Sequence, residues 1–188
     1  MKGSNKLKFL RFDLDLTTVN PYHEKESIST ILIALCATLS SYNGGNAGGK
    51  STMSQIKASD LWAQYQSKSI KQYLYEIQID NLNTSLLTIP AGAAYDSIKK
   101  HINGYSENIA KYKTDKEEIS KNAKQLEAIR DESSKHGGAF GLAVLFLEIS
   151  ILLSSIAALI KKKLLWYISM LPGLVGIIYF INGFLLFF

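Results

Sequence analysis

The 188-residue chain contains one cysteine, three histidines and three prolines. The single cysteine, Cys36, excludes an intrachain disulfide, and its place within an apolar run favours a buried small hydrophobe. His23, His101 and His136 are far apart, and none has metal-ligand spacing with a second ligand. We therefore expect no enzyme activity, no metal and no cofactor.

Acidic residues are also scarce in the C-terminal part of the chain. Glu148 is the only acid in residues 137–188, and the only other charges there are Lys161, Lys162 and Lys163. A charge near the middle of an apolar span costs roughly 2.5–3.5 kcal/mol on insertion scales, so it usually faces a partner or a wet cavity. Glu148 is therefore the first candidate for a functional residue.

Long apolar runs are what the chain has instead. Residues 137–160 and 164–188 each suffice to cross about 30 Å of hydrocarbon, which needs about 20 apolar residues. Residues 27–49 hold a shorter run, which spans a bilayer if its Gly-rich exit lies in the headgroup layer. The sequence thus predicts three transmembrane helices, although a cleaved signal peptide is the alternative for the first.

The basic loop 161–163 predicts the orientation in a bacterial inner membrane. Short loops rich in lysine face the cytoplasm, so segment 1–26 is predicted to be cytoplasmic and residues 50–136 extracytoplasmic. Within 50–136, thirteen basic residues are interleaved with eleven acids, which argues against a nucleic-acid face. The predicted partners are the lipid bilayer and other copies of the chain, with no nucleic acid and no nucleotide.

The polar middle, 50–136, has the pattern of a helical hairpin. Pro90 and Gly92 predict its turn. Before the turn, the residues that repeat every seven are Ile56, Ala63, Ile70 and Ile77. After it, a coiled-coil period places apolar residues at two seam positions, namely Tyr95, Ile102, Ile109 and Ala123, and Ile98, Tyr105, Tyr112, Ile119 and Leu126.

The predicted fold is therefore an all-α membrane protein with three transmembrane helices and a long extramembrane antiparallel hairpin between the first and the second. At 1.5 Å per residue, two helices of this size make a rod about 60 Å long. In the N-terminal segment, residues 10–16 alternate between apolar and charged side chains. That alternation predicts a short strand, with an interfacial amphipathic segment as the alternative.

Residues 44–51 match the phosphate-loop pattern G-x-x-x-x-G-K-[ST], through Gly44, Gly49, Lys50 and Ser51. The pattern has that meaning only between a buried parallel strand and a helix of an alternating β/α domain. Here an apolar run precedes it, a long helical pattern follows it, and no further strand-helix units exist to build a sheet. We interpret the match as coincidental, within a flexible membrane-exit turn.

Residues 57–76, KASDLWAQYQSKSIKQYLYE, resemble the hallmark segment of the bacterial membrane proteins grouped as domain of unknown function 4337. The positions that carry the resemblance are Ala58, Ser59, Asp60, Trp62, Tyr65, Gln66, Lys68, Ser69, Ile70, Lys71, Leu74 and Tyr75. The resemblance implies an N-terminal span, a Gly-rich exit, a helical hairpin and two C-terminal spans. It implies no activity.

The same segment offers a polar-aromatic stripe, which we take as a candidate interaction surface. Its members are Trp62, Tyr65, Gln66, Lys68 and Tyr73. One interpretation is that the stripe packs on the second hairpin helix. The other is that it packs on neighbouring subunits or on lipid headgroups, where Trp and Tyr are enriched.

Within the second span, Ser150 and Ser154 form a ridge of small residues suited to close helix contact. Glu148 lies on a different side of the helix, and we expect it to hydrogen-bond to another helix, with Asn182 or Ser169 as candidate partners. The favoured function is a non-enzymatic homo-oligomeric membrane scaffold or interaction module. The alternative is an oligomeric ion or proton channel that uses Glu148.

Overall fold

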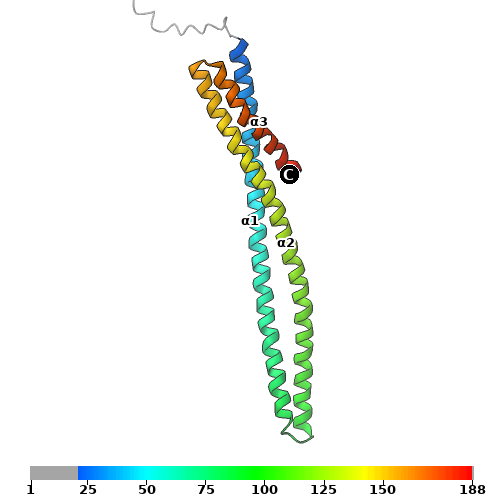
Figure 1. The fold of residues 1–188 in the computed structure, drawn as a ribbon. Coiled ribbons are helices and arrows are strands. Elements are labelled where there is room, and N and C mark those ends of the chain that lie inside the picture. The colour runs from blue at the N-terminus through cyan, green and yellow to red at the C-terminus, as the bar shows by residue number, and fades with distance from the viewer. Residues whose placement is uncertain (1–20, 188) are drawn as a thin grey trace, which may run out of the picture. The chain divides into compact units, whose positions relative to one another are not determined.

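The computed structural model describes the backbone of residues 21–187 and the side chains of residues 27–187 (Figure 1). Its elements are α1 (Pro21–Leu86), α2 (Ala93–Ile160) and α3 (Lys163–Leu185), and the described residues contain no strand. The predicted all-helical fold class is confirmed for the described residues. The strand predicted at 10–16 lies outside the described residues.

The helices form two compact units. The three-helix unit comprises residues 21–42 of α1 together with 139–187, which hold the end of α2 and all of α3. The helix pair comprises residues 43–138, which hold the rest of α1 and α2. Both long helices therefore contribute a segment to each unit.

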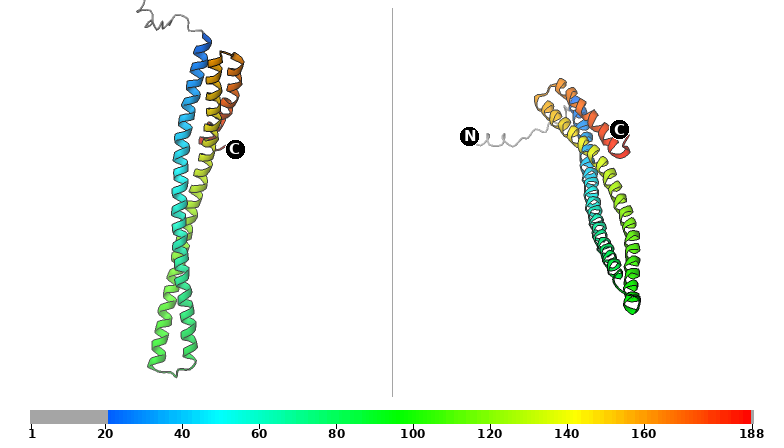
Figure 2. Two further views of the ribbon diagram at one scale, coloured as in Figure 1. Left: turned by 90° about the vertical axis from the view of Figure 1, so that its left-hand side faces the viewer. Right: turned by 60° about the horizontal axis from the view of Figure 1, so that its bottom comes forward.

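In the helix pair, α1 and α2 run antiparallel and lie next to each other (Figures 1 and 2). Trp62 Nε1 donates a hydrogen bond to Glu127 Oε1 at 2.9 Å. Further along α1, Lys68 Nζ pairs with Asp115 Oδ2 at 2.5 Å. Later residues of α1 thus meet earlier residues of α2, and the chain reverses over residues 87–92.

The heptad predicted on α2 coincides with its inward face. Every one of its nine seam residues is half-buried or buried, with Ala123 fully buried. Aromatic rings fill part of the seam, because Tyr75 of α1 lies 5.1 Å from Tyr105 and 6.0 Å from Tyr112 between ring centroids. The 3.5-residue period was therefore a sound guide to how α2 packs.

The repeat predicted on α1 faces the other way. Ile56, Ala63, Ile70 and Ile77 are all exposed, so this repeat does not line the seam with α2. A second heptad of α1 packs on α2, formed by Ser51, Ala58, Tyr65, Gln72 and Ile79 with Ser54, Leu61, Lys68, Tyr75 and Leu82. All ten are buried or half-buried, and Tyr65, Lys68 and Tyr75 among them contact α2 through a ring or a charge, which an apolar count does not recognise.

The Gly-rich segment 44–49 is helical within α1, so the predicted flexible turn is wrong. Close helix contact gives the physical reason. A Cβ built on Gly137 of α2 would lie 3.6 Å from the Gly48 nitrogen and 3.8 Å from the Gly44 carbonyl oxygen. Nearby, Ser51 Oγ donates to the carbonyl oxygen of Arg130 at 3.2 Å. Gly44 and Ala47 therefore lie at ordinary contact distance from Gly137, whereas a Cβ on Gly45, Gly48 or Gly49 would meet nothing within 4 Å.

In the three-helix unit, α3 packs on α2 through glycines. A Cβ on Gly176 would lie 2.6 Å from Leu147 Cγ, and one on Gly183 would lie 2.5 Å from Phe140 Cε1. The chain reverses between α2 and α3 at Lys161, whose φ of 56° is left-handed. The tight reversal brings α3 back alongside α2 (Figure 2).

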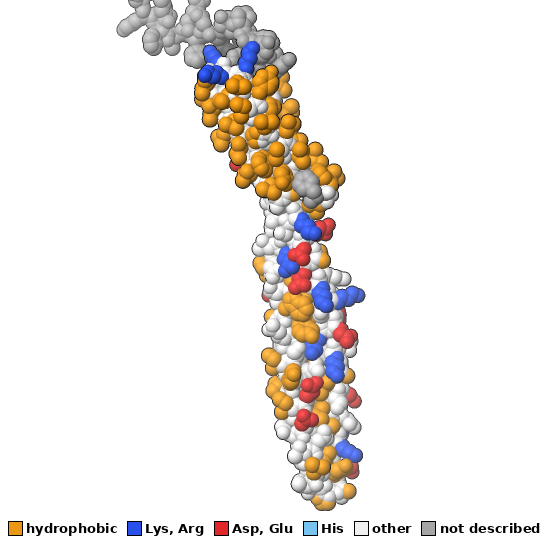
Figure 3. Space-filling model, in the orientation of Figure 1, with side chains coloured by type: hydrophobic (Ala, Val, Ile, Leu, Met, Phe, Trp, Pro, Cys, Tyr) orange, Lys and Arg blue, Asp and Glu red, His pale blue; other side chains and the backbone are white. Residues whose placement is uncertain are grey.

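The three-helix unit buries a small apolar core that includes Ile33, Phe140 and Leu147, with polar residues packed beside it. Its buried residues include Ser40, Ser150, Ser154, Ser169 and Asn182. Its exposed residues include many leucines and isoleucines, among them Ile31, Leu35, Leu152, Leu159 and Leu171. Hydrophobic side chains cover the face of this unit that is visible in Figure 3.

Candidate functional site

Glu148 lies on α2 in the three-helix unit, and its side chain is exposed. It lines a groove of about 540 Å³ together with residues of α1. The other lining residues are Ala34, Ala37, Thr38, Ser41, Tyr42 and Ile151. The groove therefore places one carboxyl group beside three hydroxyl-bearing side chains on an otherwise apolar surface.

Glu148 makes no hydrogen bond and no ion pair within the described part of the chain. The two partners considered from the sequence are engaged elsewhere. Ser169 Oγ donates to the carbonyl oxygen of Trp166 at 2.7 Å. Asn182 Oδ1 accepts a hydrogen bond from the Phe187 amide at 2.9 Å, which helps to close the end of α3. Within one chain, neither residue serves Glu148.

Ser150 and Ser154, the predicted small-residue ridge, are both buried between helices. Ser150 Oγ donates to the carbonyl oxygen of Ser169 at 2.7 Å. Ser154 and Thr30 share a hydrogen bond of 2.7 Å between their hydroxyl oxygens. The ridge therefore joins α2 to both α3 and α1, by hydrogen bonds as well as by close approach.

The matching face of α3 was not predicted from the sequence. Gly173, Gly176 and Gly183 follow Ser169 at intervals of four, three and seven residues, and all four are buried. That spacing is the available signal, because small residues recurring every three or four positions mark close contacts between apolar helices. Ser40, also unpredicted, is fully buried, and its Oγ has no hydrogen-bond partner among the described residues.

The candidate interaction stripe divides between two faces of α1. Trp62, Tyr65 and Lys68 are half-buried against α2, where Lys116 Nζ lies 5.3 Å from the Tyr65 ring centroid. Gln66 is exposed, and so is Tyr73, with an exposed fraction of 67%. The five residues therefore form no single surface, and the proposed interaction stays a prediction for the outward pair.

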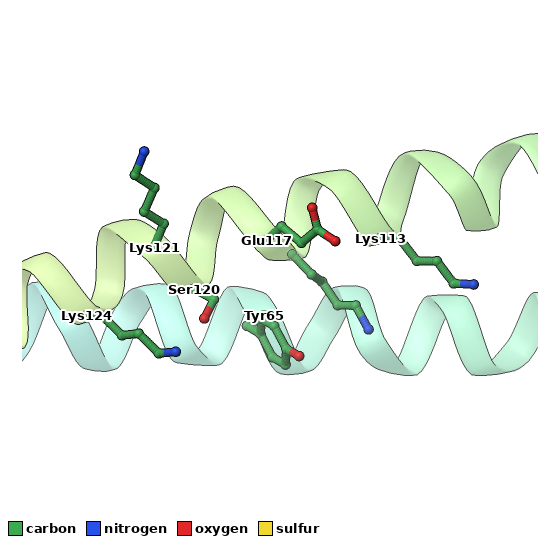
Figure 4. Close-up of a pocket in the computed structure, with 7 residues that line it drawn as sticks. Tyr65, Lys113, Glu117, Ser120, Lys121 and Lys124 are labelled. Atoms are coloured by element: carbon green, nitrogen blue, oxygen red, sulfur yellow. The ribbon is translucent and has the colours of Figure 1, made fainter.

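A second groove, of about 580 Å³, runs along the helix pair beside Tyr65 (Figure 4). Its charged lining residues are Lys113, Lys116, Glu117, Lys121 and Lys124. Lys121 points away from α1, and Glu117 lies among the lysines (Figure 4). Lysines that point in different directions, with a glutamate among them, are typical of the solvated side of a helix. We assign no ligand to this groove.

Residues 44–51, which match the phosphate-loop pattern, lie inside α1. Helical amides donate to carbonyl oxygens four residues earlier, so they cannot form the open cradle of that loop. Within the described part of the chain, no cluster of His, Cys, Asp or Glu side chains suits a metal ion. The expectation of no nucleotide and no metal stays a prediction.

The model of the family described as a domain of unknown function (DUF4337) matches residues 23–186, nearly the whole chain. The chain belongs to the DUF4337 family. The resemblance seen in residues 57–76 is thus confirmed, and it extends over both units. Searches of curated proteins and of solved structures gave no match. DUF4337 membership names no reaction.

Proposed function

We propose that this DUF4337 chain is an integral membrane protein whose three-helix unit spans a bilayer, with the helix pair as an extramembrane hairpin. The described residues include three helices that are long and apolar enough to cross, by length and composition. The exposed apolar surface of the three-helix unit supports the proposal, because large apolar side chains exposed around a unit are stable in lipid and costly in water. Buried serines and glycines suit helix contacts within a bilayer, where close packing replaces the hydrophobic effect.

We further propose an orientation in the bacterial inner membrane. Lys161, Lys162 and Lys163 lie at the reversal between α2 and α3. The positive-inside rule places such a short basic connection in the cytoplasm. The N-terminal segment 1–26 then lies on the cytoplasmic side, and residues 50–136 lie on the opposite side.

Within the membrane, the proposed role is self-association as a non-enzymatic scaffold. The observation that carries it is the exposed position of Glu148, without a partner in the described chain, on the apolar three-helix unit. A carboxyl group that faces hydrocarbon is costly if it carries a charge, and it is also costly if its polar atoms lack hydrogen-bond partners. A helix of a second copy over the groove removes Glu148 from lipid and supplies it with a hydrogen-bond partner.

The chemistry of the groove suits that contact. Thr38, Ser41 and Tyr42 bring hydroxyl groups to its wall, and each can donate or accept. Thr38 Oγ1 already donates to the carbonyl oxygen of Ala34 at 2.9 Å, so it retains acceptor capacity for a further hydrogen bond. Polar contacts of this kind between membrane helices contribute about 0.6–2 kcal/mol each.

The test is the oligomeric state of the full chain in lipid nanodiscs, measured by the distance-dependent energy transfer between labelled copies. Glu148→Leu removes both charge and hydrogen bonding, and we expect it to weaken association by about threefold to thirtyfold. Glu148→Gln retains the hydrogen bonds and is expected to associate as the wild type does.

Ser155→Ala is the matched control, because Ser155 is also exposed on α2, one heptad after Glu148, and its hydroxyl is satisfied by the Ile151 carbonyl oxygen. It should leave association unchanged. A wild-type chain that is monomeric in lipid, or a Glu148→Leu variant that associates as the wild type does, would contradict the scaffold role.

The alternative function is an ion or proton pathway, and the groove itself favours it. A carboxyl group beside hydroxyls in a space of about 540 Å³ has room for water, which relays protons. The test is proton or cation flux in proteoliposomes. Flux that falls in Glu148→Gln supports the pathway, and flux that is absent, or unchanged by the substitution, excludes it as stated.

A further inference from the structure

The two helices of the helix pair have unlike outer faces. The exposed large apolar residues of α1 in residues 43–86 are Met53, Ile56, Ile70, Tyr73, Leu74 and Ile77. In residues 93–138 of α2, Ile129 is the one such residue among those described. Charge is distributed the opposite way, with seven charged residues in the α1 segment and seventeen in the α2 segment.

The exposed apolar residues of α1 repeat with a heptad. Ile56, Ala63, Ile70 and Ile77 stand at one position, and Met53 and Leu74 stand at the second, three residues before the first. We call these six residues the outer stripe. The inner seam between α1 and α2 uses a different heptad of α1, so the outer stripe is left without a partner in the described chain. A 3.5-residue period is the signature of a helix that packs against another helix.

We propose that the outer stripe of α1 pairs with the outer stripe of a second copy, as a parallel two-stranded coiled coil. The inference rests on the proposed function, because insertion of both copies into one membrane makes their α1 helices run in the same direction. Equal residues then face one another in register, which is the arrangement of a parallel dimer.

The charges beside the stripe fit a second α1. In a parallel coiled coil, a residue flanking the seam faces the residue five positions later on the other chain. Thr52 then faces Lys57 of the second copy, and Gln66 faces Lys71 of the second copy. No like charges meet along these flanks, whereas the seventeen charges of the α2 segment would oppose an apolar stripe.

Asp60 is the exception, because it occupies the second seam position between Met53 and Leu74 and is exposed. In the proposed pair, two Asp60 carboxylates face one another and repel. This repulsion weakens the in-register pair and holds its association below that of an uncharged seam. Replacement of Asp60 by the uncharged Asn should therefore strengthen the pair.

Disulfide formation between copies tests the pairing, with the full chain in proteoliposomes. The background is Cys36→Ser, which removes the one native cysteine. Ser67→Cys places a thiol within the stripe at the second seam position, without the loss of an apolar side chain. Thr114→Cys is the matched control. Like Ser67, Thr114 is a small, exposed residue with a hydroxyl group, but it lies on α2.

We expect Ser67→Cys to crosslink at least about tenfold faster than Thr114→Cys, since thiols held in a pair have millimolar effective concentrations. Addition of Asp60→Asn should raise the yield of the Ser67→Cys crosslink further. Equal rates at the two sites overturn the proposal, and so does crosslinking of the thiol at position 67 to a different protein. An Asp60→Asn change that lowers the yield overturns the parallel register.

The outcome separates this inference from the scaffold proposal. Association in nanodiscs that depends on Glu148, without rapid crosslinking of the Ser67→Cys variant, leaves the scaffold standing and removes the stripe contact. Rapid crosslinking of that variant that is insensitive to Glu148→Leu supports the stripe and removes the groove contact. Absence of both overturns the two proposals together.

Discussion

The three-helix unit and the helix pair expose apolar side chains on their surfaces in different patterns. In the three-helix unit, exposed leucines and isoleucines occur on all three helices, and the helices meet through serines and glycines. In the helix pair, nearly all large exposed apolar side chains are on α1, while α2 presents most of the charges. A surface that is apolar on every helix suits a surrounding lipid solvent, whereas a single stripe suits one further helix.

The contacts inside the two units differ in the same way. Between α2 and α3 the fit depends on missing side chains, as at Gly176 against Leu147. Between α1 and α2 of the helix pair it depends on aromatic rings and side-chain bonds, as between Trp62 and Glu127. Steric changes should therefore affect the first unit most, and charge changes the second.

The largest expected effect is steric. Gly176→Ala adds a Cβ that would lie 2.6 Å from Leu147 Cγ and 3.0 Å from the Leu147 amide nitrogen. Because the backbone of α2 cannot yield as a side-chain end can, we expect a loss of about 1–3 kcal/mol in the stability of the three-helix unit. Thermal or detergent-induced unfolding of the full chain, followed by protection of that unit from proteolysis, measures it.

Gly141→Ala is the control for that substitution, because a Cβ at exposed Gly141 of α2 meets nothing within 4 Å. It should stabilise the helix by up to about 1 kcal/mol, through helix propensity alone. Equal effects of the two substitutions would contradict the account of a glycine-dependent contact.

A smaller effect is expected from charge in the helix pair. Lys68→Met removes the ion pair between Lys68 and Asp115. The side chains of these two residues are 30% and 31% exposed. We expect a loss of about 0.2–1 kcal/mol in the stability of the helix pair, reduced at high salt because exposed ion pairs are screened. The measurement is thermal unfolding at low and high ionic strength, and a loss independent of salt would assign the role of Lys68 to packing instead.

The smallest effect concerns Asp131, at the surface of the helix pair. The hydrogen bond from Arg130, at 2.8 Å, lowers the pKa of the Asp131 carboxyl, with the charges of Arg130 and Lys135 adding to the effect. A lowered folded-state pKa means that the stabilisation is present above the ordinary carboxyl pKa of about 3.9 and is lost as the pH falls through the lowered value.

Asp131→Asn should therefore lower the melting temperature slightly at pH 7. The difference from the wild type should vanish in acid, where Asp131 itself is protonated. Melting curves at the two pH values measure this, and a difference that persists in acid would contradict a contribution from the carboxylate charge.

Much of the architecture could be predicted from the sequence, because it depends on period and composition. The α2 seam follows from the repeat that includes Ile102 and Ile109, and the chain reverses where Pro90 and Gly92 predict a turn. The Gly-rich segment 44–49 could not be assigned in this way, since glycine permits both a turn and a close helix contact. Only the facing Gly137, far along the chain, decides between them.

The candidate site was predictable in part for a similar reason. Glu148 stands out because a charge within an apolar run is rare. Its surroundings on α1, such as Thr38 and Tyr42, depend on how helices distant in sequence pack, which no local pattern encodes. The two heptads of α1 are equally regular, and the contacts of Lys68 with Asp115 and of Tyr75 with Tyr105 show which one faces α2.

The central claim is that lipid covers the exposed apolar surface of the three-helix unit and that a second copy covers the outer stripe of α1. Spin labels in proteoliposomes test it directly, through collisions with lipid-soluble oxygen and a water-soluble nickel chelate. Leu152 and Ile70 are the sites, with exposed fractions of 65% and 62%. The account predicts strong oxygen and weak nickel contact at residue 152, and weak contact with both reagents at residue 70. Strong nickel contact at both sites would contradict it.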